Sequence, residues 1–342
     1  MGSWVFRGVL LPEGEDGEVL VGDGEQSTLP GRYAVTGLVD AHCHVTVDVD
    51  ANGFPFISDR AFADRQLAGL ADQGVAVARD VGGDSAITLD FAASTRPGLP
   101  VVVAAGRFHS TRDRYFPRMY TPCDPDDLDA SIRHEVAGGA TWVKIITDFP
   151  EVVDGVPGGE GATTYDEQTL ARAVQTAHSV GARVAAHSTM AASTVVGLGV
   201  DSIEHGNGLT EDDVKALGAR GGAWTPTIGA LTAAAEHLPP EHLPVVEALK
   251  EHYRHHLPIA LRAGVTVMAG SDASVPVARD IALLAEHGLT PLEAIRAATV
   301  SARSYLQMPP SDDLVTYDDD PRDDPAVLAR PRAVVLRGQR VR

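Results

Sequence analysis

The sequence is poor in cysteine and in positive charge, and it lacks long apolar runs. Only two of its 342 residues are cysteines, Cys43 and Cys123, too few for a disulfide framework, so we expect a reducing, cytoplasmic location. Lysine and arginine total 28 against 47 aspartates and glutamates, and the net charge of −19 argues against nucleic acid or an anionic membrane as a partner. No apolar run approaches about 18 residues and no secretory signal is recognisable, so we expect no membrane span.

What remains is the composition of an ordinary globular protein. Hydrophobic residues make up 44% of the chain and the mean hydropathy is −0.04, in a chain long enough for one large domain or two. Strand-like segments with glycine-rich turns occupy both ends of the chain. We therefore predict a small β-sandwich module formed by residues 1–34 plus 311–342, beside a central domain over residues 35–310.

Between the two ends, apolar strand-like segments alternate with helix-like segments. Nearly continuous apolar strands separated by helices are typical of parallel strands covered on their outer side. Eight such units over roughly 250 residues predict an α/β fold of the (β/α)8 TIM-barrel type. The strands are expected at residues 35–46, 75–80, 100–106, 141–147, 182–188, 201–206, 222–228 and 264–272.

The opening strand, VTGLVDAHCHVT at residues 35–46, carries two histidines one residue apart. Because residues two apart in a strand point to the same side, His42 and His44 face one way and Cys43 the other. Two imidazoles on one buried face indicate a shared metal ion, although a hydrogen-bonded structural pair would give the same pattern. Since the chemistry of such barrels lies at the carboxyl ends of the strands, a metal site requires ligands at the ends of other strands.

Ligand-type residues do occur at the other strand ends. His187 ends the fifth strand, His205 the sixth and Asp272 the eighth, while Lys144 lies inside the apolar fourth strand. A buried lone ammonium is costly, and a lysine with a lowered pKa can react with carbon dioxide to form a carbamate that bridges two cations. The alternatives are a salt bridge from Lys144 to Asp80 or Asp272, a cap formed by Asp272, and a hydrogen-bonded structural role for His187.

Two further expectations concern side chains outside this set. Glu204 precedes His205 within the same strand, so its carboxylate should point away from the site. His252 and His256 have a ligand-like spacing on one helical face, but they lie in a polar outer helix and we expect them to be solvated.

The motifs GLVDAHCH, ARDVGG, WVKIITD, AAHS, SIEHG and GSDAS, in this order and spacing, resemble those of the amidohydrolase superfamily. The most similar branch holds imidazolonepropionase-like and Xaa-Pro or Xaa-Arg dipeptidase-like enzymes. The resemblance implies two divalent metal ions, zinc in the first place, with iron or manganese as alternatives. It implies strand-end ligands for both ions: His42, His44 and Asp272 for one, His187 and His205 for the other, and N6-carboxylated Lys144 bridging them together with a hydroxide.

The reaction implied by this resemblance is hydrolysis of an amide or cyclic-amide C–N bond by the metal-bridging hydroxide, which two cations stabilise near neutral pH. Two residues would be catalytic: Asp272 would move the proton from the hydroxide to the leaving nitrogen, and Lys144 would fix the metal spacing. Asp40 and Asp80 are expected to support the ligands. For Arg79 and Asp80 we favour structural pairing over catalysis.

The loop after the third strand, GRFHSTRDRYFPRMY, is locally basic in an acidic protein. Its arginines could orient a carboxylate-bearing substrate such as a dipeptide or an N-acyl amino acid, and the alternative is a solvated loop. His109, in this loop, could contact the substrate or stabilise the developing oxyanion. The candidate substrate-binding residues are Arg107, His109, Arg112, Arg114 and Tyr115.

Two other classes of function remain open at this point. The same metal site could hydrolyse a lactone or a phosphoester or catalyse a non-hydrolytic rearrangement, because all of these need an activated water or carbonyl. The fold could also serve a non-catalytic binding protein. The leading prediction is a metal-dependent amidohydrolase acting on a small molecule, with the question of a homo-oligomer left open.

Overall fold

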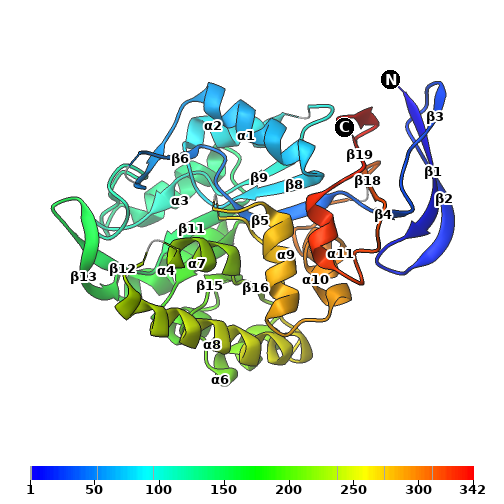
Figure 1. Ribbon diagram of the computed structural model, residues 1–342. Coiled ribbons are helices and arrows are strands. Elements are labelled where there is room, and N and C mark those ends of the chain that lie inside the picture. The colour runs from blue at the N-terminus through cyan, green and yellow to red at the C-terminus, as the bar shows by residue number, and fades with distance from the viewer. Residues whose placement is uncertain (1, 52, 95, 237, 273, 310) are drawn as a thin grey trace.

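The computed structural model describes residues 2–51, 53–94, 96–236, 238–272, 274–309 and 311–342. Short parallel strands lie at the centre of the molecule with helices around them (Figure 1). One central sheet has the order β5 (Leu38–Cys43), β8 (Val75–Asp80) and β9 (Val101–Ala104). The other has the order β10 (Phe108–His109), β11 (Trp142–Ile146), β14 (Arg183–Ser188), β15 (Ser202–His205), β16 (Ala223–Thr225) and β17 (Thr266–Val267).

Each of the eight predicted strand segments contains a strand of these two sheets, and all of their pairings are parallel. Backbone hydrogen bonds also link the two sheets. The Ala41 amide of β5 donates to the Ala269 carbonyl beyond β17 (2.9 Å), and the Thr141 amide before β11 donates to the Ala104 carbonyl of β9 (3.3 Å). The carboxyl ends of the strands therefore share one side of the molecule.

Helices follow most of the central strands and cover them from outside (Figure 1). Their apolar faces pack on the outer faces of the strands in one large core cluster. The helices are α1 (Arg60–Asp72), α2 (Ser85–Ala93), α3 (Leu128–Ala137), α4 (Glu167–Ser179), α5 (Ala192–Leu198), α6 (Glu211–Ala219), α7 (Ile228–Ala235), α8 (Leu243–Arg262), α9 (Val277–Glu286), α10 (Pro291–Ala297) and α11 (Val300–Tyr305).

Side-chain alternation along β11 explains how a lysine reaches the interior. Val143 and Ile145 belong to the large outer core, whereas Trp142 belongs to a second core cluster with residues of β5, β8 and β14. Lys144 lies between the two outward-facing side chains and is 1% exposed. Because alternate residues of a strand face opposite sides, its side chain is directed to the inner side of the sheet.

The two ends of the chain meet in a seven-stranded sheet beside the central strands (Figure 1). In it β4 pairs antiparallel with β18, with Val35 opposite Val315. Both ends thus share one sheet, but this single sheet does not confirm the predicted sandwich. Its strands are β1 (Ser3–Leu10), β2 (Glu15–Val21), β3 (Gln26–Thr28), β4 (Tyr33–Val35), β18 (Leu314–Tyr317), β19 (Ala333–Leu336) and β20 (Gln339–Arg340).

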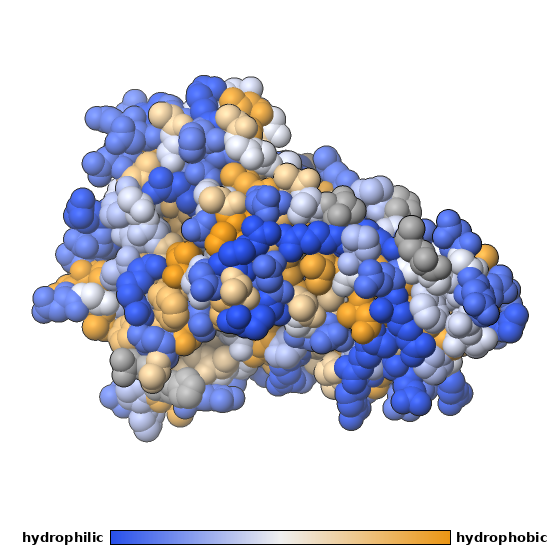
Figure 2. Space-filling view, turned by 90° about the horizontal axis from the view of Figure 1, so that it is seen from above, coloured by the Kyte–Doolittle hydropathy of each residue, from blue (hydrophilic) through white to orange (hydrophobic). Residues whose placement is uncertain are grey.

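Two hairpins extend from the central sheets: β6 (Val47–Val49) with β7 (Pro55–Ile57), and β12 (Asp148–Val153) with β13 (Val156–Thr163). The face of the molecule seen in Figure 2 is mostly hydrophilic, with apolar side chains in small groups. Within the described ranges, we find no helix with the length and apolarity needed to cross a membrane.

Candidate metal centre

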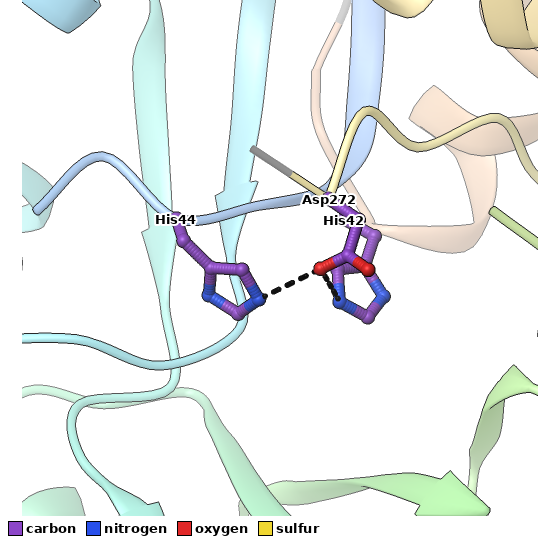
Figure 3. A group of neighbouring side chains, drawn as sticks. All are labelled: His42, His44 and Asp272. Carbon is purple, nitrogen blue, oxygen red and sulfur yellow. Dashed lines mark ion pairs between the residues drawn. The ribbon is translucent and has the colours of Figure 1, made fainter. Parts of the chain in front are cut away.

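The structure brings His42, His44 and Asp272 together at the carboxyl ends of β5 and β17. Asp272 Oδ1 lies 3.3 Å from His42 Nε2 and 3.2 Å from His44 Nε2, so one carboxylate oxygen faces both rings (Figure 3). One ligand atom from each residue can be chosen so that all three lie within 4.8 Å of one another. The histidines are buried and the Asp272 side chain is 22% exposed, so the group is reached from solvent on the side of Asp272.

The two other predicted histidine ligands, His187 and His205, lie next to this group. The ring centroid of His205 lies 5.1 Å from that of His42 and 4.5 Å from that of His187. Burial lowers the pKa of His187 to about 3 and holds the pKa of His205 well below its usual value, so both rings are neutral near pH 7. Neutral imidazoles are the form that binds metal ions.

The backbone is strained where these residues leave their strands. His205, Thr227 and Asp272 have φ values of 68°, 48° and 49°, in the left-handed region that non-glycine residues avoid. Such conformations cost on the order of 1–3 kcal/mol each and cluster at functional sites. Their occurrence at the ends of β15, β16 and β17 indicates that the rest of the fold stabilises this arrangement of side chains.

The Nδ1 atoms of three histidines are already used by hydrogen bonds. His42 Nδ1 donates to Glu204 Oε2 (2.7 Å), and His44 Nδ1 donates to the Gly82 carbonyl (2.8 Å). His205 Nδ1 lies 2.7 Å from Thr227 Oγ1, which donates its own proton to the Pro226 carbonyl (2.8 Å) and therefore accepts from the ring. In the neutral ring, with the proton on Nδ1, each Nε2 keeps its lone pair, as a metal ligand requires. Burial and Lys144 lower the pKa of His42, but Asp272 and Glu204 outweigh them and raise it, so a metal ion at Nε2 has to displace a proton.

Lys144 meets the requirement for a reactive amine. Its Nζ atom is buried and has no hydrogen-bond partner or ion pair among the described residues, so the predicted salt-bridge alternative is not found. Burial lowers the pKa of Lys144 to about 8, although the charges of Glu204 and Asp272 act in the opposite direction. His42 Nε2 also makes no hydrogen bond in the described structure, although Asp272 Oδ1 lies 3.3 Å from it. A buried amine without a partner and a histidine nitrogen that faces a carboxylate fit a divalent metal site.

Glu204 does not point away from the site, contrary to our prediction. Its side chain is fully buried, and besides His42 it binds Arg79 Nη2 through Oε1 at 2.7 Å. Burial raises the pKa of Glu204, but Arg79 and the hydrogen bond from His42 outweigh this and hold the pKa well below its usual value. Alternation ends after Glu204 because His205 adopts the left-handed conformation. Opposite charges inside two apolar strands, VAVARD and SIEH, were the available sequence signal for this pair.

The two carboxylates predicted to support the ligands bind backbone amides around them. Asp40 Oδ1 accepts from the amides of Ser271 (3.0 Å) and His42 (3.3 Å), which ties β5 to the residue before Asp272. Asp80 accepts from the Val45 amide (2.7 Å) and the Gly82 amide (3.0 Å). Since the Gly82 carbonyl accepts from His44, Asp80 holds the segment that orients this ring.

His109 does not face a substrate, contrary to our expectation. It is fully buried, its Nδ1 donates to the Lys144 carbonyl (3.1 Å), and its Nε2 accepts from Ser131 Oγ (3.1 Å). Both ring nitrogens are thus occupied by the protein itself. Burial lowers the pKa of His109 to about 4, in agreement with a neutral ring that joins β10 to β11.

We expect His109→Gln to flatten the acid dependence of stability. A histidine whose pKa falls from 6.5 when unfolded to about 4 when folded contributes stability above pH 6.5 that is lost as the pH falls toward 4. Between about pH 7 and pH 4.5, metal-free wild type should lose ~2 kcal/mol more unfolding free energy than the variant, as measured by urea unfolding. Equal losses in both proteins, or a collapse of kcat/KM in the metal-loaded variant, would contradict the structural role.

The other candidate substrate-binding residues of this loop have different surroundings from those of His109. Arg107 Nη2 donates to the Thr121 carbonyl (2.6 Å), Arg112 is exposed, and Arg114 Nη1 donates to the Phe149 carbonyl (3.3 Å). Tyr115 is buried, with its ring centroid 6.0 Å from that of His187. Of these candidates, Tyr115 therefore lies against a proposed ligand.

We expected His252 to be solvated, and the structure contradicts this. It is half-buried, its ring packs against Trp224 with centroids 6.3 Å apart, and its Nε2 lies 3.2 Å from the Gly206 carbonyl. Burial lowers the pKa of His252 to about 4. It thus attaches α8 to the residue that follows His205.

Comparisons with known proteins agree with the sequence motifs. The profile of the Amidohydrolase family matches residues 33–311. An uncharacterized protein of Mycobacterium tuberculosis (strain ATCC 25618 / H37Rv) is 32% identical over 362 residues, which cover 97% of this chain and 94% of that protein. A crystal structure of a Xaa-Pro dipeptidase with bound methionine has a TM-score of 0.82 at 20% identity, over 99% of both chains.

A second solved structure, of a prolidase complexed with N-methylphosphonate-L-proline, has a TM-score of 0.79 at 23% identity, again over 99% of both chains. These structural likenesses identify the fold as a TIM-barrel-like α/β fold. The family match spans most of the chain and includes all of the predicted ligand positions. The chain therefore belongs to the amidohydrolase family and is an amidohydrolase, as its motifs predicted.

Proposed function

We propose that this protein is a metal-dependent hydrolase that cleaves an amide or cyclic-amide C–N bond of a small molecule. The ligands of its two divalent ions would be His42, His44, N6-carboxylated Lys144, His187, His205 and Asp272. The observation that carries the proposal is the convergence of the Nε2 atoms of His42 and His44 on one oxygen of Asp272, together with the buried Lys144 amine that has no hydrogen-bond partner among the described residues. Imidazole and carboxylate donors suit zinc first, and iron or manganese as well.

When bound, the ions would supply Lewis-acid activation of water and of the scissile carbonyl. The proposed role of Asp272 in proton transfer follows from its position and its charge. Buried histidine partners keep the pKa of Asp272 well below its usual value even though burial alone would raise it, so its carboxylate is ionised near neutral pH. Being partly exposed, it can take a proton from the attacking water and return it to the leaving nitrogen.

The surrounding protein would keep this geometry fixed. The carbonyl, carboxylate and hydroxyl partners of Nδ1 hold His42, His44 and His205 in a single tautomer each. A carbamate on Lys144 would convert a costly buried amine into an anionic ligand whose charge the metal ions balance.

For the substrate, we propose a carboxylate-bearing dipeptide or N-acyl amino acid. The prolidase structure with a bound proline derivative supports this class by fold likeness. Tyr115, packed beside His187, is the best supported contact, and Arg107, Arg112 and Arg114 remain proposed contacts in the same loop. We also propose that residues 35–310 form a closed barrel and that 1–34 plus 311–342 form the second module, with the hydrogen bond from Ala41 to Ala269 supporting closure.

Removal of metal should abolish the activity. The purified protein should contain about two equivalents of divalent metal per chain, and a chelator should reduce hydrolysis of responsive substrates by roughly a thousand-fold. The assay is a panel of N-acyl amino acids, dipeptides and cyclic amides, with a lactone and a phosphoester as controls for reaction class. Reconstitution with Zn²⁺, Mn²⁺ or Fe²⁺ should restore the rate. Far less than one equivalent of metal, with chelator-insensitive activity or no activity, would favour a metal-independent enzyme or a binding protein.

A further inference from the structure

A buried ion pair lies directly behind the proposed metal centre. Arg79 and Glu204 come from β8 and β15, and both side chains are fully buried. Arg79 also donates from Nε to the Ala41 carbonyl (2.5 Å) and from Nη1 to Ser202 Oγ (3.0 Å), and its guanidinium stacks 4.5 Å from the ring of Trp142. These contacts fix the position of the cation on three sides.

The carboxylate of Glu204 divides its two oxygens between different partners. Oε1 accepts from Arg79 Nη2 (2.7 Å) and from Ser202 Oγ (2.5 Å), while Oε2 accepts from His42 Nδ1 (2.7 Å). An ionised carboxylate only accepts hydrogen bonds, so the partner nitrogen of His42 must carry the proton. The fixed Arg79 prevents the carboxylate from turning away from the ring.

We propose that Arg79 and Glu204 are a positioning pair that keeps a proton on His42 Nδ1 and thereby leaves Nε2 as the nitrogen available to the metal ion. The proposal rests on the proposed metal site but concerns the protein's own hydrogen-bond network, which exists without metal. A purely structural ion pair would stabilise the fold without determining which nitrogen of His42 is protonated. The two roles therefore predict different effects of an isosteric substitution.

The decisive variant is Glu204→Gln. Because Arg79 can only donate, the amide oxygen of the new side chain must face Arg79, and its NH₂ group then faces His42 Nδ1. The ring must respond by accepting at Nδ1 and carrying its proton on Nε2, where it blocks the metal. In the double variant Arg79→Met with Glu204→Gln, the amide is released from this constraint, since Ser202 can either donate or accept. It can then offer its oxygen to His42 again.

Two measurements test these states. Because the pKa of His42 is raised, ¹⁵N NMR of the histidine-labelled, metal-free protein is recorded at a pH high enough for this ring to be neutral, where it reports the tautomer of His42. The His42→Asn variant identifies its signals. Competition with a chromophoric chelator reports the affinity for Zn²⁺. We expect Glu204→Gln to move the proton to Nε2 and to weaken Zn²⁺ binding about 10- to 100-fold. The double variant should return the proton to Nδ1 and bind Zn²⁺ more tightly than the single variant.

The control variant is Asp313→Asn. It also removes the acidic partner of a buried arginine, Arg303, whose Nη2 lies 3.3 Å from Asp313 Oδ2 and whose described contacts include none of the proposed ligands. This variant should lower thermal stability without altering the His42 tautomer or Zn²⁺ affinity. If it weakens Zn²⁺ binding as much as Glu204→Gln does, the effect reflects stability and the proposal is wrong.

Other outcomes also decide the matter. A His42 proton that stays on Nδ1 in Glu204→Gln, or a double variant weaker than the single one, would overturn the positioning role. If Glu204→Gln does not fold, the double variant alone is tested, and a His42 proton on Nε2 in it would overturn the positioning role. If wild type binds no Zn²⁺, the proposed function fails, while the tautomer measurement still tests the pair.

Discussion

Replacing Lys144 by alanine is expected to remove metal and activity together. The substitution eliminates the bridging ligand that the protein itself is predicted to supply, and losing several kcal/mol of Lewis-acid stabilisation corresponds to roughly a thousand-fold or greater fall in kcat/KM. The measurement combines metal analysis of the purified variant with steady-state kinetics on a substrate from the panel. The fold should persist, because the change removes a buried amine that has no partner among the described residues.

Chemical rescue gives this prediction its control. Acetate or propionate should enter the space left by the lysine in Lys144→Ala, supply the missing carboxylate and restore part of the activity. Lys144→Met fills that space with an uncharged side chain and should not be rescued. Lys215→Ala, which changes an exposed lysine on α6, should retain wild-type activity. Full metal content and full activity in Lys144→Ala would refute the bridging role.

Replacing Asp272 by asparagine should have a comparable effect for a different reason. Asparagine keeps the size of the side chain but cannot accept a proton near neutral pH, and general-base catalysis contributes about 10²- to 10⁴-fold. We expect kcat to fall within that range while KM changes little, because the lost interaction acts on proton transfer. Since Asp272 Oδ1 also faces His42 and His44, Zn²⁺ affinity should fall as well.

The kinetic measurement should be made at saturating Zn²⁺, so that weaker metal binding does not account for the loss of rate. Ser274→Ala is a matched neighbour, because Ser274 is exposed and donates to the Asp272 carbonyl at 3.0 Å without touching its carboxylate. It should remain near wild type. A metal-loaded Asp272→Asn enzyme with unchanged kcat would show that another group moves the proton.

Strand ends were the part of the site that sequence could predict. Asp272 lies more than 200 positions from His42 and His44 in the chain, yet the structure brings the three side chains together. The physical reason is that parallel strands covered by helices place all their carboxyl ends on one side, so the order of motifs translates into proximity. The inward direction of Lys144 could also be predicted from the sequence. Val143 and Ile145 on either side of it face the outer core, so alternation along the strand directs Lys144 to the inner side of the sheet.

Two erroneous expectations came from long-range contacts and a local backbone distortion. Alternation predicted an outward Glu204, but the left-handed conformation of His205 and the cation of Arg79 on another strand direct it to His42. The basic loop predicted a substrate-facing His109, but the Lys144 carbonyl and Ser131, from β11 and α3, occupy its nitrogens. These partners of Glu204 and His109 are distant from them in the sequence, so a local sequence pattern does not encode the contacts.

The sequence by itself thus determined the family, the parallel α/β architecture and the set of strand-end residues, because these depend on periodicity and on order along the chain. The tertiary structure alone decided which ring nitrogen of His42, His44 and His205 is taken by a protein partner and which buried charges lie behind His42. Those features depend on hydrogen bonds between strands that are distant in the chain, and such bonds form only when the sheet and its helices have packed.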